Sequence, residues 1–436
     1  MSKPAIGFVG LGAMGFGMAT QLVKQGYPVH GFDVFPASVE RFKAAGGIPA
    51  SSLQESASGK QYYVCMVATA AQAQSALFGE AGIVSALPNN ATLILTSTVP
   101  ASYAQSVAAE LQSIGRGDIL FIDAPVSGGA IRAAQGTLSI MAGASDTALK
   151  SGRFLLEAMS DSNKLYLVPG GVGAGSNMKM VHQVLAGIHI LGGSEAMGFA
   201  AQLGLDATKA AEAIKASDAW SWMHENRLQR LLEEDWHPGA SAISIILKDV
   251  ASSLPPPDKT NFPLPLCTSA EQVYLSAVLQ GNATVDDASM VRHYYNKPVL
   301  SVSDTRSATE TAEALQLVLD MMEVTNLVAA AEAVAFARHL KVDLKQFFTL
   351  VSDAAGSSRQ FVTKGLEMIE GRIGEKAGSP TISDAIARLE KAVQKARDLH
   401  CPLYLGNSAL NVLFLAKRAG LEKESSSSVI KVFGSN

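Results

Sequence analysis

The pattern that most restricts the fold lies near the amino-terminal end, where a short apolar strand runs directly into a glycine-rich turn and a helix. Ala5–Val9 is the expected strand, and Gly26 marks the end of the expected helix. Turns of the form G-x-G-x-x-G suit dinucleotides: the first glycine permits a tight turn, the second lets the backbone approach a pyrophosphate, and the third lets the helix pack on the strand. The turn residues are therefore predicted to bind a dinucleotide: Gly10, Leu11, Gly12, Ala13, Met14 and Gly15.

A second expected strand, Val29–Asp33, ends in an acid one helix after Gly15. A carboxylate at this position can bind the 2′-hydroxyl of a ribose, whereas a 2′-phosphate would meet its negative charge. No arginine follows Asp33 until Arg41, so NAD is favoured over NADP. The alternative is a tight turn without a ligand, with Asp33 as a helix cap.

Further short apolar runs predict strands at Tyr62–Val67, Thr92–Thr96 and Ile119–Ile122. A doubly wound parallel sheet binds its ligands at the carboxyl ends of the strands. The residues that follow the first two of these strands are therefore expected to line the cofactor: Val67, Ala68, Thr69, Ser97 and Thr98.

The third of these strands leads into a loop from Asp123 to Gly129, and the segment from Gly136 to Gly143 returns as another strand. Within the loop, Ser127 offers a hydroxyl group, and Gly128 and Gly129 leave backbone N–H donors unobstructed, which suits a carboxylate ligand. A plain turn is an equally weighted alternative for the loop alone.

A second glycine-rich turn, Gly171–Gly175, opens a long apolar helix that is expected to end near Gly204. Lys179 is followed by His182 and Gln183, and spacings of three and four residues place the three polar groups on one helix face. Apolar neighbours remove water from an ammonium group, which lowers the pKa of a lysine and lets it exchange protons. The alternative is a surface lysine beside a core histidine, and the dinucleotide motif upstream favours the acid/base role.

The composition excludes several classes of protein. Hydrophobic residues make up 48% and charged residues 17% of the 436 residues, which indicates a core-rich protein of two or three domains. The net charge is −4 and no basic block occurs, so neither nucleic acid nor a membrane surface is an expected partner. Three dispersed cysteines and eight histidines show no metal-ligand spacing, so no metal is predicted. With no room for a signal peptide before Ala5 and no apolar run that approaches membrane-spanning length, a cytoplasmic location is expected.

These motifs together resemble the β-hydroxyacid dehydrogenases, which are related to 3-hydroxyisobutyrate and 6-phosphogluconate dehydrogenases. The matching segments are Gly7–Gly15, Asp123–Gly129 with Gly136–Leu138, Gly173–Gly175 with Lys179, and Lys248-Asp249. The resemblance implies that Ser127, Gly128 and Gly129 hold the substrate carboxylate and that Lys179 is the general acid/base. It also implies that Lys248 closes over both nicotinamide and substrate, and that His182 and Gln183 bind substrate where most hydroxyisobutyrate-type members have two asparagines.

Three stretches look more specifically like the L-threonate dehydrogenase subgroup: Lys179–Gln183, Ser221–Arg227 and Phe262–Leu266. That resemblance implies a C4 sugar acid oxidised at its C2 hydroxyl. Two features depart from it: Trp220 stands where the subgroup usually has asparagine, and Pro255-Pro256-Pro257 interrupts a segment that should be helical.

The carboxy-terminal half repeats itself. Glu195-Ala196 recurs as Glu332-Ala333, and at nearly the same spacing Phe262–Leu266 recurs as Cys401–Leu405. The predicted fold is α/β plus all-α: a doubly wound parallel-sheet dinucleotide-binding domain at 1–168, then two tandem copies of a 6-phosphogluconate-dehydrogenase-like helical domain at 169–300 and 310–436. A polar linker is expected around Ser301–Glu313.

The second copy is predicted to be structural. Carrying the repeat spacing along the chain places Gln316, Leu319 and Ala387 at the positions of Lys179, His182 and Lys248, so one active site is expected. The second copy keeps an apolar helical pattern, and it is expected to dock on the first as a built-in mate, which gives a monomer or a homodimer.

The sequence therefore predicts NAD-dependent oxidation of a small 2- or 3-hydroxy acid, with an L-threonate-like C4 sugar acid as the leading substrate and Lys179 as the general acid/base. One alternative is a reductase of small aldehyde acids such as glyoxylate or succinic semialdehyde, whose relatives usually prefer NADPH. The other is a non-catalytic NAD-binding scaffold.

Overall fold

The computed structural model describes residues 3–237, 241–253, 262–375 and 378–434. The three prolines Pro255-Pro256-Pro257 lie outside the described residues. The chain divides into two compact units, Met1–Lys179 and Met180–Asn436. Helix α9 (Ala174–Gln202) begins in the first unit and continues into the second.

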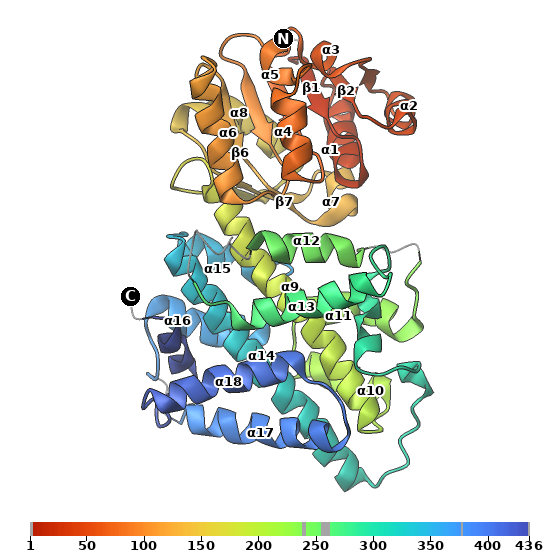
Figure 1. Ribbon diagram of the computed structural model, residues 1–436, viewed down its shortest axis with the longest axis vertical. Helices are drawn as coiled ribbons and strands as arrows, with labels where there is room; N and C mark the ends of the chain where they lie inside the picture. The colour runs from red at the N-terminus through yellow and green to blue at the C-terminus, as the bar shows by residue number, and fades with distance from the viewer. Residues whose placement is uncertain (1–2, 238–240, 254–261, 376–377, 435–436) are drawn as a thin grey trace. The chain divides into compact units, whose positions relative to one another are not determined.

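The first unit is built on a parallel sheet with the strand order β3-β2-β1-β4-β5-β6 (Figure 1). Its strands are β1 (Ile6–Val9), β2 (Val29–Phe32), β3 (Ile48–Pro49), β4 (Tyr62–Cys65), β5 (Thr92–Leu95) and β6 (Leu120–Asp123). The helices between them are α1 (Ala13–Lys24), α2 (Pro36–Ala44), α3 (Leu53–Ala57), α4 (Ala70–Phe78), α5 (Ile83–Ala86) and α6 (Ala101–Ser113). This order reverses between β1 and β4, which is the switch point where such sheets bind ligands.

The strands alternate their apolar side chains between two cores, one on each face of the sheet. Phe8 and Ile94 belong to one core, whereas Leu93 and Leu95 belong to the other. A sheet covered on both faces is what the doubly wound prediction requires, because parallel strands bury both sides.

The chain after β6 forms a second, three-stranded sheet. It consists of β7 (Val126–Ser127), β8 (Leu138–Ala142) and β9 (Ser160–Leu167), with β7 antiparallel and β9 parallel to β8. Helix α7 (Gly129–Gln135) lies between β7 and β8 in the chain, and α8 (Asp146–Met159) lies between β8 and β9. A Cβ atom at Gly17 of α1 would lie 2.7 Å from the backbone nitrogen of Ala134, so a glycine there lets α7 pack against α1.

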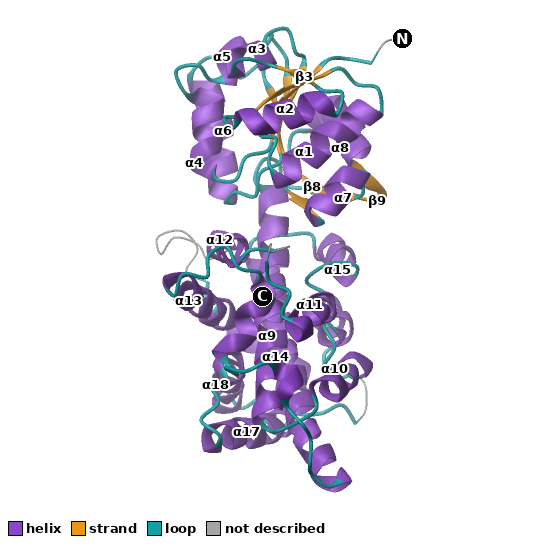
Figure 2. Cartoon of the chain, turned by 90° about the vertical axis from the view of Figure 1, so that its right-hand side faces the viewer, coloured by secondary structure: helices purple, strands orange, loops and turns teal. Residues whose placement is uncertain are grey.

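The second unit is helical and contains the same series of elements twice (Figures 1 and 2). After α9, the first series is α10 (Ala207–Ala216), α11 (Trp222–Glu233), α12 (Ile243–Ser253), α13 (Pro265–Leu279) and the 3-10 segments η1 (Asp287–His293) and η2 (Val299–Ser301). The second is α14 (Ala308–His339), α15 (Leu344–Ser352), η3 (Phe361–Gly365) with α16 (Leu366–Glu370), α17 (Ile382–Asp398), α18 (Tyr404–Arg418) and η4 (Ser426–Phe433). The fold class predicted from the sequence, with two tandem helical copies, is confirmed.

The linker between the copies is shorter than the expected Ser301–Glu313. Helix α14 already begins at Ala308, because the Ser307 hydroxyl and the Glu310 carboxylate form a capping box with each other's backbone N–H groups. The capping box is a local signal that turns the second half of the expected linker into helix.

The two copies meet at residues that are counterparts of each other. Ser221 and its counterpart Ser358 form an antiparallel bridge, and the hydroxyls of Ser269 and its counterpart Ser408 lie 2.9 Å from each other. In a two-fold contact, a residue on the axis meets its own counterpart. The second copy therefore packs on the first as a two-fold mate does in a dimer.

Two buried glutamates hold this contact reciprocally. Glu195 of α9 accepts hydrogen bonds from the N–H groups of Leu405 (3.1 Å) and Gly406 (2.9 Å) at the start of α18. Glu332 of α14 accepts them from Leu266 (2.9 Å) and Cys267 (3.0 Å) at the start of α13. Neither α13 nor α18 has a side-chain cap from its own N-cap residue, so each copy caps a helix of the other. Burial raises the pKa of Glu195 to about 7 and that of Glu332 to about 8.

Helix α9 is long and apolar enough to cross a membrane by length and composition, so the expectation that no apolar run approaches that length was wrong. Its apolar stretch is fully buried inside the protein. Figures 1 and 2 show α9 and α14 in the middle of the second unit, surrounded by its shorter helices. The apolar composition of α9 is therefore that of a core helix with neighbours on all sides.

We predict that a chain ending after Val302 dimerises or aggregates, since the cut bares the apolar face that the second copy covers. It also removes both N–H donors from the buried Glu195 carboxylate, at a cost of about 1–3 kcal/mol for an unmet buried group. Size-exclusion chromatography with light scattering checks this, and the full-length chain, expected as a monomer, is the control. A truncated chain that stays monomeric, soluble and fully active would show that the second copy is dispensable.

Candidate active site

The glycines of the first turn differ in the space that the protein leaves for a side chain. A Cβ atom at Gly10, whose φ is +92°, would lie 1.9 Å from the Met66 carbonyl oxygen, and one at Gly15 would lie 1.8 Å from the carbonyl oxygen of Gly10. A Cβ atom at Gly12 would meet nothing within 4 Å, and φ there is an ordinary −71°. The packing of the protein thus requires Gly10 and Gly15 but leaves open space beside Gly12.

This open space fits the expected dinucleotide. Gly12 is the N-cap of α1 and provides no side-chain cap, and both Gly12 and Ala13 are exposed. Unpaired N–H groups at a helix start favour an anion such as a pyrophosphate. The turn can therefore hold the pyrophosphate against backbone alone, which agrees with a nicotinamide dinucleotide.

Asp33 and Arg41 lie at the same turn. The Asp33 carboxylate accepts hydrogen bonds from the N–H groups of Leu11 (2.6 Å) and Phe35 (2.9 Å). The Arg41 guanidinium donates to the Leu11 carbonyl oxygen (3.0 Å) and lies 4.0 Å from the ring centre of Phe16. Arg41 is eight residues from Asp33 along the chain, yet the structure brings both charged side chains to Leu11 of the glycine-rich turn.

The remaining cofactor candidates of the first unit also gather at the carboxyl edge of the sheet. The Ser97 hydroxyl accepts a hydrogen bond from the Val67 N–H (2.9 Å), which ties the loops after β4 and β5 together. Thr69 caps α4, Ala68 is exposed, and Thr98 is half-buried. Because β1 and β4 are neighbours in the sheet, these loops flank the glycine-rich turn.

The Ser127–Gly129 loop has an open backbone. Ser127 ends β7 and is half-buried, and its hydroxyl forms no hydrogen bond with the part of the chain that the structure describes. Gly128 and Gly129 have φ values of +138° and +72°, and a Cβ atom at Gly129 would meet nothing within 4 Å. The loop therefore presents a hydroxyl group and exposed glycine backbone, as a carboxylate site requires.

Asp123 anchors the start of helix α9, a role that the sequence reasoning missed. Its fully buried carboxylate accepts hydrogen bonds from the N–H groups of Gly173 (3.1 Å) and Ser176 (2.8 Å) and from the Ser176 hydroxyl (2.7 Å). A Cβ atom at Gly175 would lie 2.2 Å from the Met141 carbonyl oxygen, so the helix start packs directly on backbone. Burial raises the pKa of Asp123 to about 6, while its hydrogen bonds act in the opposite direction.

The polar face predicted on α9 is buried: Lys179 is 4%, His182 0% and Gln183 7% exposed. The Gln183 amide donates to Asp249 of α12 (2.5 Å) and lies 3.1 Å from the His182 Nδ1. Since the carboxylate can only accept, the amide nitrogen of Gln183 faces Asp249 and its oxygen faces His182. A neutral His182 ring therefore carries its proton on Nδ1.

Lys248 extends this polar chain. Its ammonium group lies 3.0 Å from the second oxygen of Asp249. A Cβ atom at Gly187 of α9 would lie 2.4 Å from the Val250 side chain, so the glycine lets α12 approach α9 closely. The structure thus brings together His182, Gln183 and Lys248 through Asp249, a residue of the Lys248-Asp249 motif that the sequence did not predict as a site residue.

Trp220, the departure from the L-threonate pattern, lies at the contact between the copies. Its indole N–H donates to Glu225 (2.7 Å), its carbonyl oxygen accepts from the Arg359 N–H (3.0 Å), and the Arg359 guanidinium lies 5.7 Å from its ring centre. The tryptophan therefore belongs to the two-fold contact beside Ser221.

The class that the fold and these residues define is an oxidoreductase with a nicotinamide dinucleotide cofactor. Residues 5–170 match the NAD binding domain of 6-phosphogluconate dehydrogenase, and residues 173–294 and 311–433 both match the family described as NAD-binding of NADP-dependent 3-hydroxyisobutyrate dehydrogenase. The two matched segments of the second family correspond to the two helical copies.

Known proteins place the chain within that class. It is 36% identical over 287 residues to L-threonate dehydrogenase of Cupriavidus necator, a match that covers 66% of this chain and 95% of that protein. With the Escherichia coli L-threonate dehydrogenase it shares 34% identity over 288 residues, 66% of this chain and 93% of that protein. The solved 3-hydroxyisobutyrate dehydrogenase of Salmonella typhimurium is 33% identical with a TM-score of 0.60, covering 66% of this chain and 99% of that one. The chain therefore belongs to the β-hydroxyacid dehydrogenase family and is a hydroxyacid dehydrogenase.

A more distant likeness extends over both helical copies. The 6-phosphogluconate dehydrogenase of Plasmodium falciparum has a TM-score of 0.66 over 94% of this chain and 92% of its own, at 13% identity. At that identity it shows the fold alone, and it does so for the duplicated arrangement.

We predict that Asp123→Ala destabilises the first unit and lowers activity, because the buried N–H groups of Gly173 and Ser176 lose their acceptor, at about 1–3 kcal/mol each. Asp123→Asn is the matched control, since an amide oxygen can accept from both N–H groups while the amide nitrogen faces the Ser176 hydroxyl. Chemical denaturation and turnover of both variants check the prediction. Equal stability of the Ala variant and the wild type would contradict the anchoring role.

The same pair of variants tests the pH dependence. Because the folded pKa of Asp123, about 6, lies above the usual 3.8, the folded state binds the proton more tightly than the unfolded state. Its contribution to the free energy of unfolding is present below about pH 4 and is lost as the pH rises through about 6. The Asn variant should lack this decline.

Proposed function

We propose that this chain oxidises an L-threonate-like C4 sugar acid at its C2 hydroxyl with NAD. The proposal rests above all on the likeness to L-threonate dehydrogenases, which spans almost the whole of those proteins. The buried Lys179, on the helix that supplies the Gln183–Asp249 contact, agrees with it. A C4 acid of this kind carries its carboxylate beside the carbon to be oxidised. One group in the site must therefore bind the carboxylate, and another must accept the proton of the C2 hydroxyl.

In this proposal the chain's own residues bind, orient and move one proton. The turn at Gly12 holds the pyrophosphate and Asp33 the ribose, and the bound nicotinamide supplies the hydride acceptor. Ser127, Gly128 and Gly129 hold the substrate carboxylate, which fixes the carbinol carbon.

Lys179 then acts as the general base. Its neutral amine takes the hydroxyl proton while the hydride leaves the same carbon, so the alcohol becomes a carbonyl group and the lysine becomes an ammonium. The Asp249–Gln183–His182 contacts fix the orientation of these side chains. In this proposal Lys248 contacts both the substrate and the nicotinamide. The substrate loses one proton and one hydride in total.

We further propose that the enzyme works in the cytoplasm as a monomer. Cys65, Cys267 and Cys401 are buried free thiols, as is usual in a reducing compartment. The two-fold contact that relatives of one helical copy would need from a second chain is supplied here within the chain.

Reduction of a small aldehyde acid with NADPH is the second candidate function. Arg41 favours it, because its guanidinium lies at the turn where a 2′-phosphate would be bound. A panel of C3 to C5 hydroxy acids and aldehyde acids, followed by the absorbance of the reduced nicotinamide with NAD and NADP, distinguishes the two. Turnover of L-threonate with NAD supports the first proposal, and turnover of aldehyde acids alone, with NADPH, would replace it with the second.

We predict that Lys179→Met lowers kcat by about 10²-fold or more, the range for a positioned acid/base, while NADH affinity stays nearly unchanged. Steady-state kinetics and NADH titration measure the two quantities. The control is Gln316→Met, the same change at the counterpart position of the second copy, which should leave kcat as it is. Substantial activity in Lys179→Met would remove the lysine from its role.

We predict that the wild type prefers NAD and that Asp33→Ser shifts the ratio of kcat/KM values towards NADP by about tenfold, because a negative charge is removed beside the retained Arg41. Adding Arg41→Ala to Asp33→Ser should cancel that gain. A wild type that already prefers NADP would show that Arg41, and not Asp33, decides the cofactor.

A further inference from the structure

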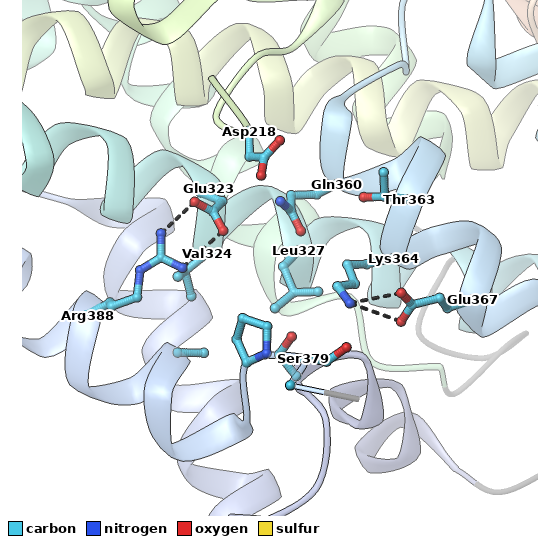
Figure 3. A pocket seen from close by; sticks show the side chains of 14 residues that line it. Asp218, Glu323, Val324, Leu327, Gln360, Thr363, Lys364, Glu367, Ser379 and Arg388 are labelled. Carbon is cyan, nitrogen blue, oxygen red and sulfur yellow. Dashed lines mark hydrogen bonds and ion pairs between the residues drawn. The ribbon is translucent and has the colours of Figure 1, made fainter. Parts of the chain in front are cut away.

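A cavity of about 280 Å³ lies in the second helical copy, where the predicted function assigns no chemistry (Figure 3). Polar side chains from several elements line it, among them Asp218, Glu323, Gln360, Lys364, Glu367 and Ser426. Apolar side chains, including Val324, Leu327 and Pro380, complete the wall. The volume lies just below the usual range for small-molecule sites, roughly 300–1,000 Å³, so only a small ligand fits.

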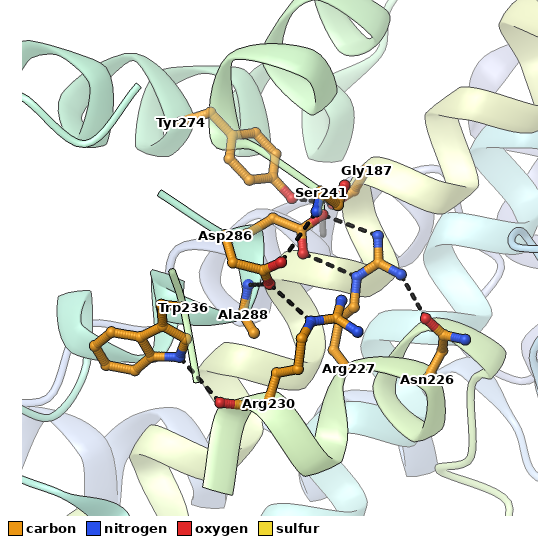
Figure 4. Close-up of polar contacts among 10 residues, drawn as sticks. Gly187, Asn226, Arg227, Arg230, Trp236, Ser241, Tyr274, Asp286 and Ala288 are labelled. Carbon is orange, nitrogen blue, oxygen red and sulfur yellow. Dashed lines mark hydrogen bonds and ion pairs between the residues drawn. The ribbon is translucent and has the colours of Figure 1, made fainter. Parts of the chain in front are cut away.

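The first copy fills the counterpart of this cavity with ion pairs (Figure 4). There, Arg227 binds both oxygens of the buried Asp287 (2.8 and 2.9 Å), and Arg230 binds Asp286 (3.1 Å). The spacing of the repeat places Lys364 at the position of Arg227 and Ser426 at that of Asp287. The shorter side chains of the second copy do not bridge this space, and both line the cavity.

Two buried polar side chains at the cavity lack a hydrogen-bond partner among the residues that the structure describes. These are Gln360, which is 6% exposed, and Ser426, which is 4% exposed. Figure 3 shows the Gln360 amide among the lining side chains. Its counterpart in the first copy is Met223, which is apolar. Because the Gln360 amide lines the cavity and is not hydrogen-bonded to any described residue, a ligand in the cavity can bind it without breaking a contact within the protein.

The charges at the cavity select a cation. Lys364 is already paired with both oxygens of Glu367 (2.9 and 3.2 Å), and Arg388 with Asp320 and Glu323 (2.7 and 2.5 Å). Among the residues that line the cavity, Asp218, Glu323 and Glu367 are acidic and Lys364 and Arg388 are basic, which leaves a surplus of one negative charge.

An organic cation fits this surplus better than a metal ion. Nowhere in the described ranges do three His, Cys, Asp or Glu side chains form a group that could hold a metal. The apolar wall suits an aliphatic chain, and the carboxylates with the Gln360 oxygen suit ammonium N–H donors.

We propose that the second copy carries a binding site for a small aliphatic ammonium compound, at the place where the first copy has its Arg227–Asp287 ion pair. Asp218 belongs to the first copy and stands three residues before the Ser221–Ser358 bridge. A ligand there would therefore join the two copies at their two-fold contact. The site is independent of the proposed catalytic residues.

The experiment measures binding to the full-length protein by thermal unfolding and titration calorimetry. The probe is 1,4-diaminobutane, with 1,4-butanediol and succinate of equal chain length as neutral and anionic comparisons at constant ionic strength. We expect a saturable rise in Tm of about 2–5 °C with the diamine alone. If none of the three raises Tm, or if the diol or succinate does so equally, the cavity holds water only and the proposal is overturned.

Variants that introduce the residues of the first copy locate the site. Gln360→Met should weaken diamine binding by about tenfold, and Lys364→Arg combined with Ser426→Asp should abolish it, while both proteins unfold without ligand at or above the wild-type Tm. Asp218→Asn should also weaken binding, whereas Glu390→Gln, which removes one exposed charge from α17, should not. Unchanged affinity in Gln360→Met would place the binding elsewhere and refute the proposal.

Discussion

The packing of the helical unit depends on two buried glutamates, each of which accepts hydrogen bonds from the backbone of the other copy. Helices α9 and α14 are apolar on most faces, so each needs neighbours all around, and a glutamate in such a core is stable only with hydrogen-bond donors. Glu195 and Glu332 obtain them from the starts of α18 and α13, which lack caps of their own. Neither copy satisfies its glutamate or caps its helix alone. The reciprocal contact therefore explains why the two copies form one compact unit.

This packing has been kept while the chemistry of the copies has diverged. In the first copy, Gln183 of α9 donates to Asp249 of α12. At the counterpart positions of the second copy, Asp320 of α14 accepts from Arg388 of α17. A polar contact between the corresponding helices is retained, but the donor and the acceptor have exchanged helices. The counterpart of Lys179 on α9 is Gln316. These positions serve packing in both copies, and in the proposed mechanism only the first copy uses them for catalysis.

Local patterns were sufficient to predict much of this protein from its sequence. The strand, glycine-rich turn and helix, the spacing of Lys179, His182 and Gln183, and the spacing of the repeat all involve residues that are near each other or similar in kind. What escaped prediction depends on partners that only the folded chain brings together. Most of the residues of strand β9 are polar, and the strand belongs to the second sheet. The Asp123 carboxylate accepts hydrogen bonds from backbone N–H groups far along the chain. Arg41, on the helix that follows the second strand, donates to the glycine-rich turn.

The proposed catalytic geometry depends on Asp123, whose hydrogen-bond partners the sequence did not predict. Asp123 ends β6 four residues before Ser127, and its carboxylate binds Ser176, three residues before Lys179. The Ser127–Gly129 loop and Lys179 are thus both connected to Asp123. The loop follows Asp123 in the chain, and the helix that carries Lys179 is hydrogen-bonded to its carboxylate. For proton transfer, a substrate held by its carboxylate must present its carbinol hydroxyl within hydrogen-bond reach of the amine, about 2.6–3.2 Å. Because three hydrogen bonds to a buried group allow little movement, Asp123 would fix this spacing in the proposed mechanism without contacting the substrate.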